Sequence, residues 1–511
     1  AYLLSAFFLA GAAVTAREAA ATCAAPAPGG EWRSLNHDLH NSRNQTAEAA
    51  IDVTNVTALA PAYKFRAADV VANQGAFQST PIVADGCVYV GSSTGWVFAL
   101  AADDLSLVWV SNSAGTPDPL DGFVLGLAVE NGLVYAFPSE KEPFGPHAVA
   151  LDQSTGEVAW QTARLNTPPV AGDPTTDGPT LHASPVVFDG MAFVALSRGI
   201  GARRVPHYFL NALTGDVIKQ VHFLSETEVQ QGYGGAGMWS TPAVDLDTKT
   251  MYAGTADSEA FKRQHRYNNA ILKIRADAND PDTLGTVLDA YSGVQERYVD
   301  PVVPGLEKNP LCEMFGGPDD PLGGTSPSSS NSCLELDVDF GASPTLFLND
   351  EGGGIERKMI GEMQKAGVFH AIYAEHMQLA WARIISYPSP TGNAGTAAYD
   401  GKKLYVSANP GSLFAFDKTT GFPEWAGSSG GDALRYQPMT YANGVVYTVN
   451  NAGNLIAVDA ATGVPLLNRP VSVDADGEPC VAQGGGVAVA RNTVYVQCDL
   501  SGWVIAYRLP P

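Results

Sequence analysis

One phrase recurs along the chain, and it limits the folds that the chain can adopt. Its clearest copy, residues 443–463, reads NGVVYTVNNAGNLIAVDAATG. Two runs with β-branched and aromatic residues at period two flank a turn that contains Asn and Gly, which predicts a β-hairpin. The Thr-Gly pair at its end supplies the next turn, because glycine tolerates the positive φ that such a turn needs.

Related phrases begin near residues 85, 131, 189, 249, 400 and 491, and several end at a Thr-Gly pair followed by a tryptophan. The spacing between their aromatic residues ranges from 42 (Tyr405 to Tyr447) to 59 (Phe193 to Tyr252). A degenerate copy at residues 357–371 divides the one longer gap, which ends at Tyr405. The sequence therefore predicts an all-β fold, an eight-bladed β-propeller of four-stranded antiparallel blades.

A propeller of this size accounts for most of the 511 residues as a single domain, residues 31–511. Propellers commonly close when an N-terminal strand completes the last blade and removes its exposed edge. We expect residues 59–65 to do this here. The repeat lapses at about residues 275–338, where Pro, Gly and Asn are frequent, and we expect a long loop insertion that lies over one face as a lid.

The first residues are typical of an export signal. Residues 1–14 are apolar over a length that is too short to span a bilayer but fits the core of a signal peptide. We expect a signal peptide at residues 1–16, truncated at its start, and then a flexible leader at residues 17–30. The mature chain is expected to have no transmembrane span and to be periplasmic or extracellular.

Export permits disulfides, and the chain has six cysteines. Cys312 and Cys333 bracket a loop rich in Pro, Gly and Ser, so we expect a disulfide to close that loop. The other pairings stay open, because sequence alone does not decide connectivity.

The charge balance excludes one class of partner. The chain has 30 Lys and Arg against 53 Asp and Glu, a net charge of −23, and it lacks the basic stripe of a nucleic-acid-binding protein. The excess acid is more typical of a solvated surface than of a docking patch for a basic electron-transfer partner.

Three local phrases are more specific than the repeat. They are MWSTP at residues 238–242 with YAGTAD at 252–257, LDVDFGASP at 336–344, and MQKAGVF at 363–369. Together with HDLHNSR at 37–43, they resemble the pyrroloquinoline-quinone (PQQ) dependent alcohol dehydrogenases, and in particular the polyvinyl alcohol dehydrogenase-like branch. The resemblance extends from residue 32 to residue 509.

This resemblance implies a PQQ-repeat propeller that carries PQQ and Ca²⁺ on its axis and oxidises a secondary or polymeric alcohol by hydride transfer to the quinone. It places Trp239 at the stacking indole, Asp257 and Asp339 at the metal, Asp339 also at the catalytic base, Lys365 at the cation near the reactive carbonyl, and Gln78 at a polar contact to the cofactor. No C-x-x-C-H motif for covalent haem is present, so electrons would pass to a separate acceptor such as a cytochrome c.

The chemistry of these residue types fits the implied roles. Ca²⁺ prefers hard oxygen ligands, and an aspartate beside a divalent cation stays ionised, as a base must. Three of these residues could also have purely structural roles. Trp239 could fill space between blades, Asp257 could be an acidic residue of a turn, and Lys365 could be a solvated lysine at the edge of a blade. Asp339 is harder to explain in this way, because an isolated buried acid is costly.

The sequence also departs from the family. The region that should supply a glutamate ligand in blade 3, residues 196–204, reads LSRGIGARR and has no carboxylate, and the family's TGN phrase is replaced by Thr-Ala-Asp at 255–257. The adjacent cysteines of methanol-type members are missing. Two alternatives therefore stay open: a non-catalytic propeller that acts as a protein-assembly or ligand-binding scaffold, and a sugar- or polymer-binding module.

Overall fold

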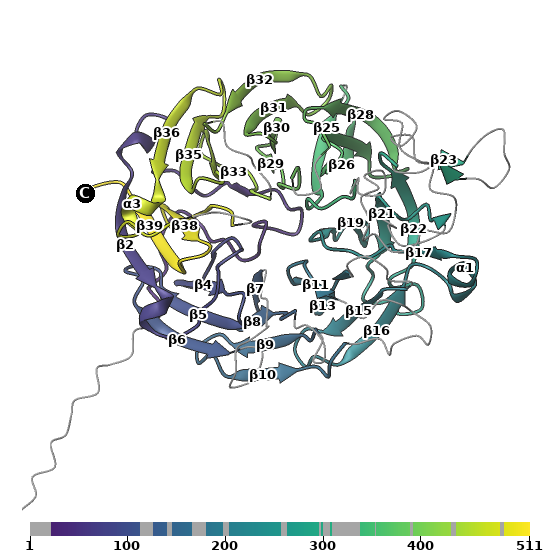
Figure 1. The fold of residues 1–511 in the computed structure, drawn as a ribbon, viewed down its shortest axis with the longest axis horizontal. Coiled ribbons are helices and arrows are strands. Elements are labelled where there is room, and N and C mark those ends of the chain that lie inside the picture. The colour runs from purple at the N-terminus through teal and green to yellow at the C-terminus, as the bar shows by residue number, and fades with distance from the viewer. Residues whose placement is uncertain are drawn as a thin grey trace, which may run out of the picture.

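The computed structural model is an eight-bladed β-propeller, so the fold predicted from the repeats is confirmed (Figure 1). It describes residues 22–112, 126–139, 146–165, 180–197, 204–256, 263–295, 298–299, 307–308, 338–352, 354–388, 392–430, 436–480 and 485–511. Eight antiparallel sheets form a ring, and in each sheet the first strand borders the central axis while the last lies on the rim.

The first four blades each contain four strands in chain order. Blade 1 contains β3 (Ile82–Ala84), β4 (Cys87–Gly91), β5 (Trp96–Ala101) and β6 (Leu107–Asn112). Blade 2 contains β7 (Leu127–Glu130), β8 (Leu133–Ala136), β9 (Val149–Asp152) and β10 (Val158–Gln161). Blade 3 contains β12 (Val186–Phe188), β13 (Met191–Val194), β15 (Pro206–Asn211) and β16 (Val217–His222). Blade 4 contains β18 (Ala243–Asp245), β19 (Thr250–Gly254), β21 (Ala270–Arg275) and β22 (Val287–Ser292).

The other four blades also contain four antiparallel strands, although blade 7 gains a fifth strand and blade 8 takes its outer strand from the N-terminal part of the chain. Blade 5 contains β25 (Thr345–Asp350), β26 (Glu356–Gln364), β27 (Val368–Tyr373) and β28 (Gln378–Ile384). Blade 6 contains β29 (Ala398–Tyr399), β30 (Lys403–Ala408), β31 (Ser412–Asp417) and β32 (Pro423–Ser428). Blade 7 contains β33 (Thr440–Ala442), β34 (Val445–Val449), β35 (Asn454–Asp459) and β36 (Pro465–Pro470), and β1 (Asn44–Gln45) joins it in parallel. Blade 8 contains β37 (Ala488–Ala490), β38 (Thr493–Cys498), β39 (Trp503–Arg508) and β2 (Ala60–Arg66).

Short elements lie outside the blades. They are the strand pairs β11 (Thr180–Leu181) with β14 (Leu196–Ser197), β17 (Tyr233–Gly234) with β20 (Arg263–Gln264), and β23 (Tyr298–Val299) with β24 (Glu307–Lys308), the α-helices α1 (Glu226–Gln230) and α3 (Val471–Asp474), and the 3-10 helices η1 (Val56–Ala58) and η2 (Ala67–Asp69). No helix within the described ranges has the length and apolar character needed to cross a membrane.

A tryptophan on the outer strand docks neighbouring blades together. The indole N–H of Trp109 in blade 1 donates to the main-chain oxygen of Gln153 in blade 2 at 3.0 Å, and the ring covers Gly156. A Cβ built on Gly156 would lie 2.5 Å from the indole, so only glycine fits beneath the ring. The same contact joins Trp160 to Gly215, Trp381 to Gly421 and Trp425 to Gly463. The Thr-Gly and Trp positions of the repeat therefore encode the packing between blades.

This dock can be tested with two glycines of blade 2. Gly156 and Gly132 have nearly the same φ, 73° and 75°, but a Cβ on Gly132 would meet nothing within 4 Å. Both alanine variants carry the same backbone strain, so their difference reports the clash with Trp109. We expect Gly156→Ala to lower the free energy of unfolding by about 1–3 kcal/mol more than Gly132→Ala does, measured by denaturant titration. Equal losses would contradict the dock.

The ring closes as the sequence predicts. Strand β2 pairs antiparallel with β39 and supplies the outer strand of blade 8. This arrangement removes the open edge that a linear array of blades would leave.

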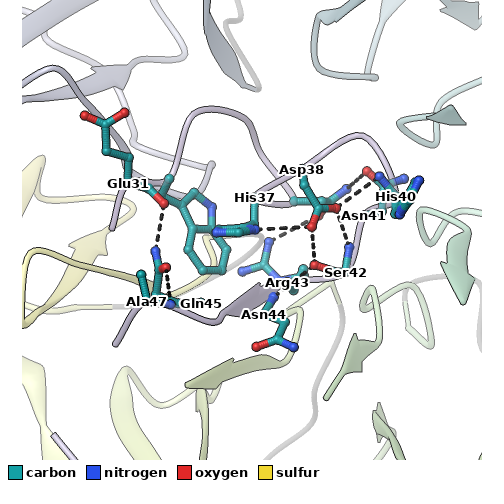
Figure 2. Close-up of polar contacts among 12 residues, drawn as sticks. Glu31, His37, Asp38, His40, Asn41, Ser42, Arg43, Asn44, Gln45 and Ala47 are labelled. Carbon is teal, nitrogen blue, oxygen red and sulfur yellow. Dashed lines mark hydrogen bonds and ion pairs between the residues drawn. The ribbon is translucent and has the colours of Figure 1, made fainter. Parts of the chain in front are cut away.

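The N-terminal segment, residues 29–45, runs across the central axis and contacts the inner strands of most blades (Figures 1 and 2). Its main chain forms hydrogen bonds with the inner strands of blades 1, 2, 4, 5, 6 and 7, and the Gln45 amide reaches blade 8. The partners on the inner strands are Val83, Val129, Val244, Leu346, Tyr399, Tyr441 and Val489. We call residues 29–45 the axial segment.

Arg43 lies near the C-terminal end of the axial segment and is fully buried (Figure 2). Its guanidinium donates to the main-chain oxygens of Met439 and Val487 and to the hydroxyl of Thr440, which ties blades 7 and 8 to the axis. It also lies 5.2 Å from the ring centroid of Trp32. Burial lowers the pKa of Arg43 to about 9, a cost that these hydrogen bonds offset.

Two expectations about connecting segments are wrong. Residues 22–30 are not a flexible leader, because a disulfide joins Cys23 to Cys87 and the Arg491 main-chain N–H donates to Gly29. The expected insertion at residues 275–338 begins too early, because β22 pairs with β21 and completes blade 4. The second disulfide of the described chain joins Cys480 to Cys498. The signal peptide at residues 1–16 and the pair Cys312–Cys333 lie outside the described residues.

Candidate functional site

Three of the predicted site residues meet where blades 4 and 5 approach the axis. The Trp239 indole Nε1–H donates to Asp339 Oδ2 at 2.6 Å. Lys365 Nζ lies 3.0 Å from Asp339 Oδ1 and 4.3 Å from the centroid of the Trp239 ring. An aromatic ring, a carboxylate and an ammonium group thus form one cluster, which we call the axial cluster.

The repeat explains why these residues meet. Trp239 lies in the segment that leads into β18, and Asp339 lies in the segment that leads into β25. These two inner strands belong to neighbouring blades and lie side by side. Lys365 follows β26 directly, and its main-chain N–H donates to the Asp339 carbonyl at 3.1 Å. The two phrases DVDFGASP and QKAG are therefore linked by the backbone as well as by their side chains.

Burial separates the axial cluster from ordinary surface and packing residues. Asp339 and Lys365 are each 5% exposed, so Lys365 is not a solvated blade-edge lysine. Trp239 is half-buried, whereas the docking tryptophans of the blades are almost fully buried. A Cβ on Gly341 would lie 2.1 Å from the Trp239 ring, so glycine at this position leaves room for the indole.

Two predicted residues are not part of this cluster. Gln78 precedes β3 in blade 1, and within the described chain no hydrogen bond joins its side chain to the axial cluster. Asp257 lies outside the described residues, directly after Ala256, and so do residues 198–203 of the stretch without a carboxylate.

Glu362 is a buried carboxylate near the cluster that the motifs did not identify. It lies on β26 and is 1% exposed, and neither of its carboxylate oxygens has a hydrogen-bond partner among the described residues. Burial and the negative charge of Asp339 raise its pKa well above the usual range. A Cβ on Gly254 in blade 4 would lie 2.1 Å from Glu362 Oε1, so the carboxylate fills the space that this glycine leaves.

A signal for Glu362 was present in the repeat. Gly361 pairs with Thr345 at the start of β25, and Glu362 follows it. At the corresponding position the other seven blades carry valine, alanine or threonine, namely Val90, Ala136, Val194, Ala253, Val406, Thr448 and Val496. An acid at an apolar position of a repeat marks a special site.

His182 was also missed. It precedes the proline of blade 3 by three residues, as Gln78 and Trp239 do in blades 1 and 4. Its side chain is exposed, yet the surrounding protein and the charge of Lys365 lower its pKa to about 4. The imidazole is therefore neutral at neutral pH and lies within electrostatic range of the axial cluster.

The raised pKa of Glu362 predicts a pH-dependent stability. The native state holds a proton that the unfolded chain releases above the ordinary value of 4.5, so this group makes unfolding easier as pH rises. The effect is at most about 1.4 kcal/mol per pH unit. In a chelator, Glu362→Gln should therefore gain stability over the natural chain, and the gain in thermal or denaturant unfolding should grow as the pH rises above the ordinary value of 4.5. A difference that does not change with pH would contradict this charge state.

Two family models match separate parts of the chain. One is described as the β-propeller domain of glucose, ethanol and alcohol dehydrogenases and matches residues 32–122. The other is described as the outer membrane protein assembly factor BamB and matches residues 366–509. Both models describe PQQ-type propeller repeats.

Characterised relatives are similar over most of the chain. A polyvinylalcohol dehydrogenase from Sphingopyxis sp. (strain 113P3) is 24% identical over 92% of this chain and 73% of its own length. A polyvinylalcohol dehydrogenase from Pseudomonas sp. is 24% identical over 81% of this chain and 66% of its own length. A quinohaemoprotein alcohol dehydrogenase from Comamonas testosteroni is 22% identical over 50% of this chain, which spans only 37% of that relative.

Solved structures share the fold. The quinohaemoprotein alcohol dehydrogenase from Comamonas testosteroni superposes with a TM-score of 0.67 at 17% identity, covering 94% of this chain and 82% of that one. A europium-containing methanol dehydrogenase superposes with a TM-score of 0.68 at 15% identity, covering 94% and 98%. BamB from Moraxella catarrhalis superposes with a TM-score of 0.53 at 13% identity, covering 88% and 99%. The chain is thus an eight-bladed β-propeller with matches to two PQQ-type repeat models, and it resembles the quinoprotein alcohol dehydrogenases.

Proposed function

We propose that this protein is a PQQ-dependent oxidoreductase that oxidises an alcohol. The observation that carries the proposal is the axial cluster, in which an indole ring, a carboxylate and a buried ammonium group converge at the inner ends of two blades. The similarity to alcohol dehydrogenases over most of the chain supports the same reaction class.

The residues of the axial cluster fit a planar anionic cofactor. The half-buried indole of Trp239 offers an aromatic face, and Lys365 brings a positive charge to the same place. Gln78 and His182 occupy the equivalent positions of blades 1 and 3 and would contact the edge of the cofactor. When bound, the quinone would accept the hydride, which carries both electrons of the oxidation.

Asp339 has the properties of the proton acceptor. Its Oδ2 accepts the indole N–H of Trp239, and its Oδ1 forms an ion pair with the ammonium group of Lys365, which fixes the orientation of the carboxylate. A carboxylate in this setting can take the hydroxyl proton of an alcohol as the hydride leaves its carbon, and the alcohol becomes a carbonyl compound. Lys365 would stabilise the negative charge that develops nearby.

The finer assignments belong to the same proposal. The metal would be Ca²⁺, held by Asp339 and Asp257, and the substrate a secondary or polymeric alcohol. Electrons would leave through a separate acceptor such as a cytochrome c. An exported protein, periplasmic or extracellular, fits the two disulfides, Cys23–Cys87 and Cys480–Cys498, which are typical of an oxidising compartment.

Replacing Asp339 tests the proposal. Asp339→Asn keeps the shape of the side chain but removes the base, so turnover of alcohols with PQQ and Ca²⁺ should fall by about 10²–10⁴ in a dye-linked assay. Asp245→Asn is the matched control, because Asp245 is another buried aspartate paired with a lysine, Lys358, at 2.7 Å. Its turnover should stay close to that of the natural chain. Normal turnover in Asp339→Asn would overturn the assignment of the base.

One observation favours a second function. The BamB model matches residues 366–509, and a BamB structure shares the fold, so a non-catalytic assembly scaffold is the alternative. A natural chain that binds neither PQQ nor an alcohol would favour this alternative.

A further inference from the structure

The buried carboxylate of Glu362 needs a partner that the described residues do not provide. Both of its oxygens lack hydrogen bonds, although the side chain is 1% exposed. A buried polar group without partners is costly, and native proteins rarely keep one without a functional reason. The side chain occupies a position that is apolar or threonine in every other blade, so blade packing does not require an acid here.

The chain makes room for this carboxylate on the neighbouring blade. Gly254 ends β19, and a Cβ there would lie 2.1 Å from Glu362 Oε1 and 2.8 Å from the main-chain oxygen of Phe340. Gly254 has no positive φ, so space and not backbone conformation explains the glycine. The Phe340 carbonyl oxygen and the Glu362 carboxylate therefore both lie close to Gly254. Phe340 directly follows Asp339 in the chain.

We propose that Glu362, together with Asp339 and the main-chain oxygen of Phe340, binds a divalent cation at the junction of blades 4 and 5. Glu362 would then supply the carboxylate that residues 196–204 of blade 3 lack. This inference deepens the proposed function, since the cation lies beside the same axial cluster. The ligands are all oxygen atoms, which is the set that Ca²⁺ and trivalent lanthanides prefer.

The charges of the site support a cation. Asp339 and an ionised Glu362 carry two negative charges, and Lys365 carries one positive charge. A divalent cation brings the sum to one positive charge, which suits an anionic quinone.

Within the described ranges, no group of three or more His, Cys, Asp or Glu side chains is arranged to bind a metal. The two carboxylates alone would leave a Ca²⁺ ion short of its usual six to eight ligands. Main-chain oxygens, water and the cofactor would supply the others. The affinity of the protein alone should therefore be moderate and should depend strongly on each carboxylate.

Cation binding can be measured without quinone and without turnover. Tb³⁺ binds oxygen sites and is sensitised by a nearby indole, so titration of the natural chain should give luminescence through Trp239, and Ca²⁺ should compete for the site. Glu362→Gln should weaken Tb³⁺ and Ca²⁺ binding by at least about tenfold, because it removes one charged ligand. Isothermal titration calorimetry with Ca²⁺ gives the same comparison without a luminescent probe.

Glu48→Gln is the matched control. Glu48 is also buried, but one of its oxygens accepts main-chain N–H groups from Ala50 and Ile51, away from blades 4 and 5. Its variant should bind cations as the natural chain does. The proposal is overturned if the natural chain binds neither cation at millimolar concentration, if Glu362→Gln binds as tightly as the natural chain, or if Glu48→Gln loses as much affinity.

This result is separable from the proposed function. Cation binding that depends on Glu362, in a protein that oxidises no alcohol, would support the cation site and reject the enzyme. Alcohol oxidation that persists in Glu362→Gln, with unchanged Ca²⁺ affinity, would support the enzyme and reject Glu362 as a ligand.

Discussion

The inner strands of the propeller border a shared axis, and the axial segment supplies hydrogen bonds that those strands cannot make with one another. Buried main-chain N–H and C=O groups without partners would destabilise the ring. Residues 29–45 bond to inner strands of seven blades, and the Arg43 side chain donates to blades 7 and 8. Four tryptophans thus join neighbouring blades near the rim, and the axial segment joins blades at the axis.

The axial segment also helps to position the axial cluster. Asn41 of the axial segment donates to the carbonyls of Thr241 and Pro344, which follow Trp239 and Asp339 toward the inner strands. The axial segment therefore supports the cluster from one side. Blades 4 and 5 bring together an acid, a cation and a second buried acid, and this concentration of charge sets their junction apart from the other described interfaces between blades.

The blades and their closure could be predicted because local sequence patterns encode them. Most copies of the repeat are 42 to 59 residues apart, and the degenerate copy at residues 357–371 divides the one longer gap, so local patterns were enough to predict eight blades and their closure. Trp239, Asp339 and Lys365 were identified by resemblance, and the structure brings them together. Their roles stay proposals.

The features that were missed depend on distant partners. Glu362 is buried because Gly254, more than a hundred residues earlier, leaves space for it, and no local pattern shows this. Residues 22–30 are anchored by Cys87, and disulfide connectivity cannot be deduced from sequence. Strand β22 follows a Pro- and Asp-rich turn that resembles the start of a loop, so the insertion was predicted to begin too early.

Binding of PQQ to the purified protein tests the central claim most directly. Calorimetric titration in excess Ca²⁺ should show one PQQ per chain, and Trp239→Ala should weaken binding by at least about fivefold, since stacking on the indole is worth on the order of 1 kcal/mol or more. Trp96→Ala, which removes a half-buried tryptophan of blade 1, should bind normally. No binding at tens of micromolar PQQ, or equal binding by Trp239→Ala, would contradict a quinone site at the axial cluster.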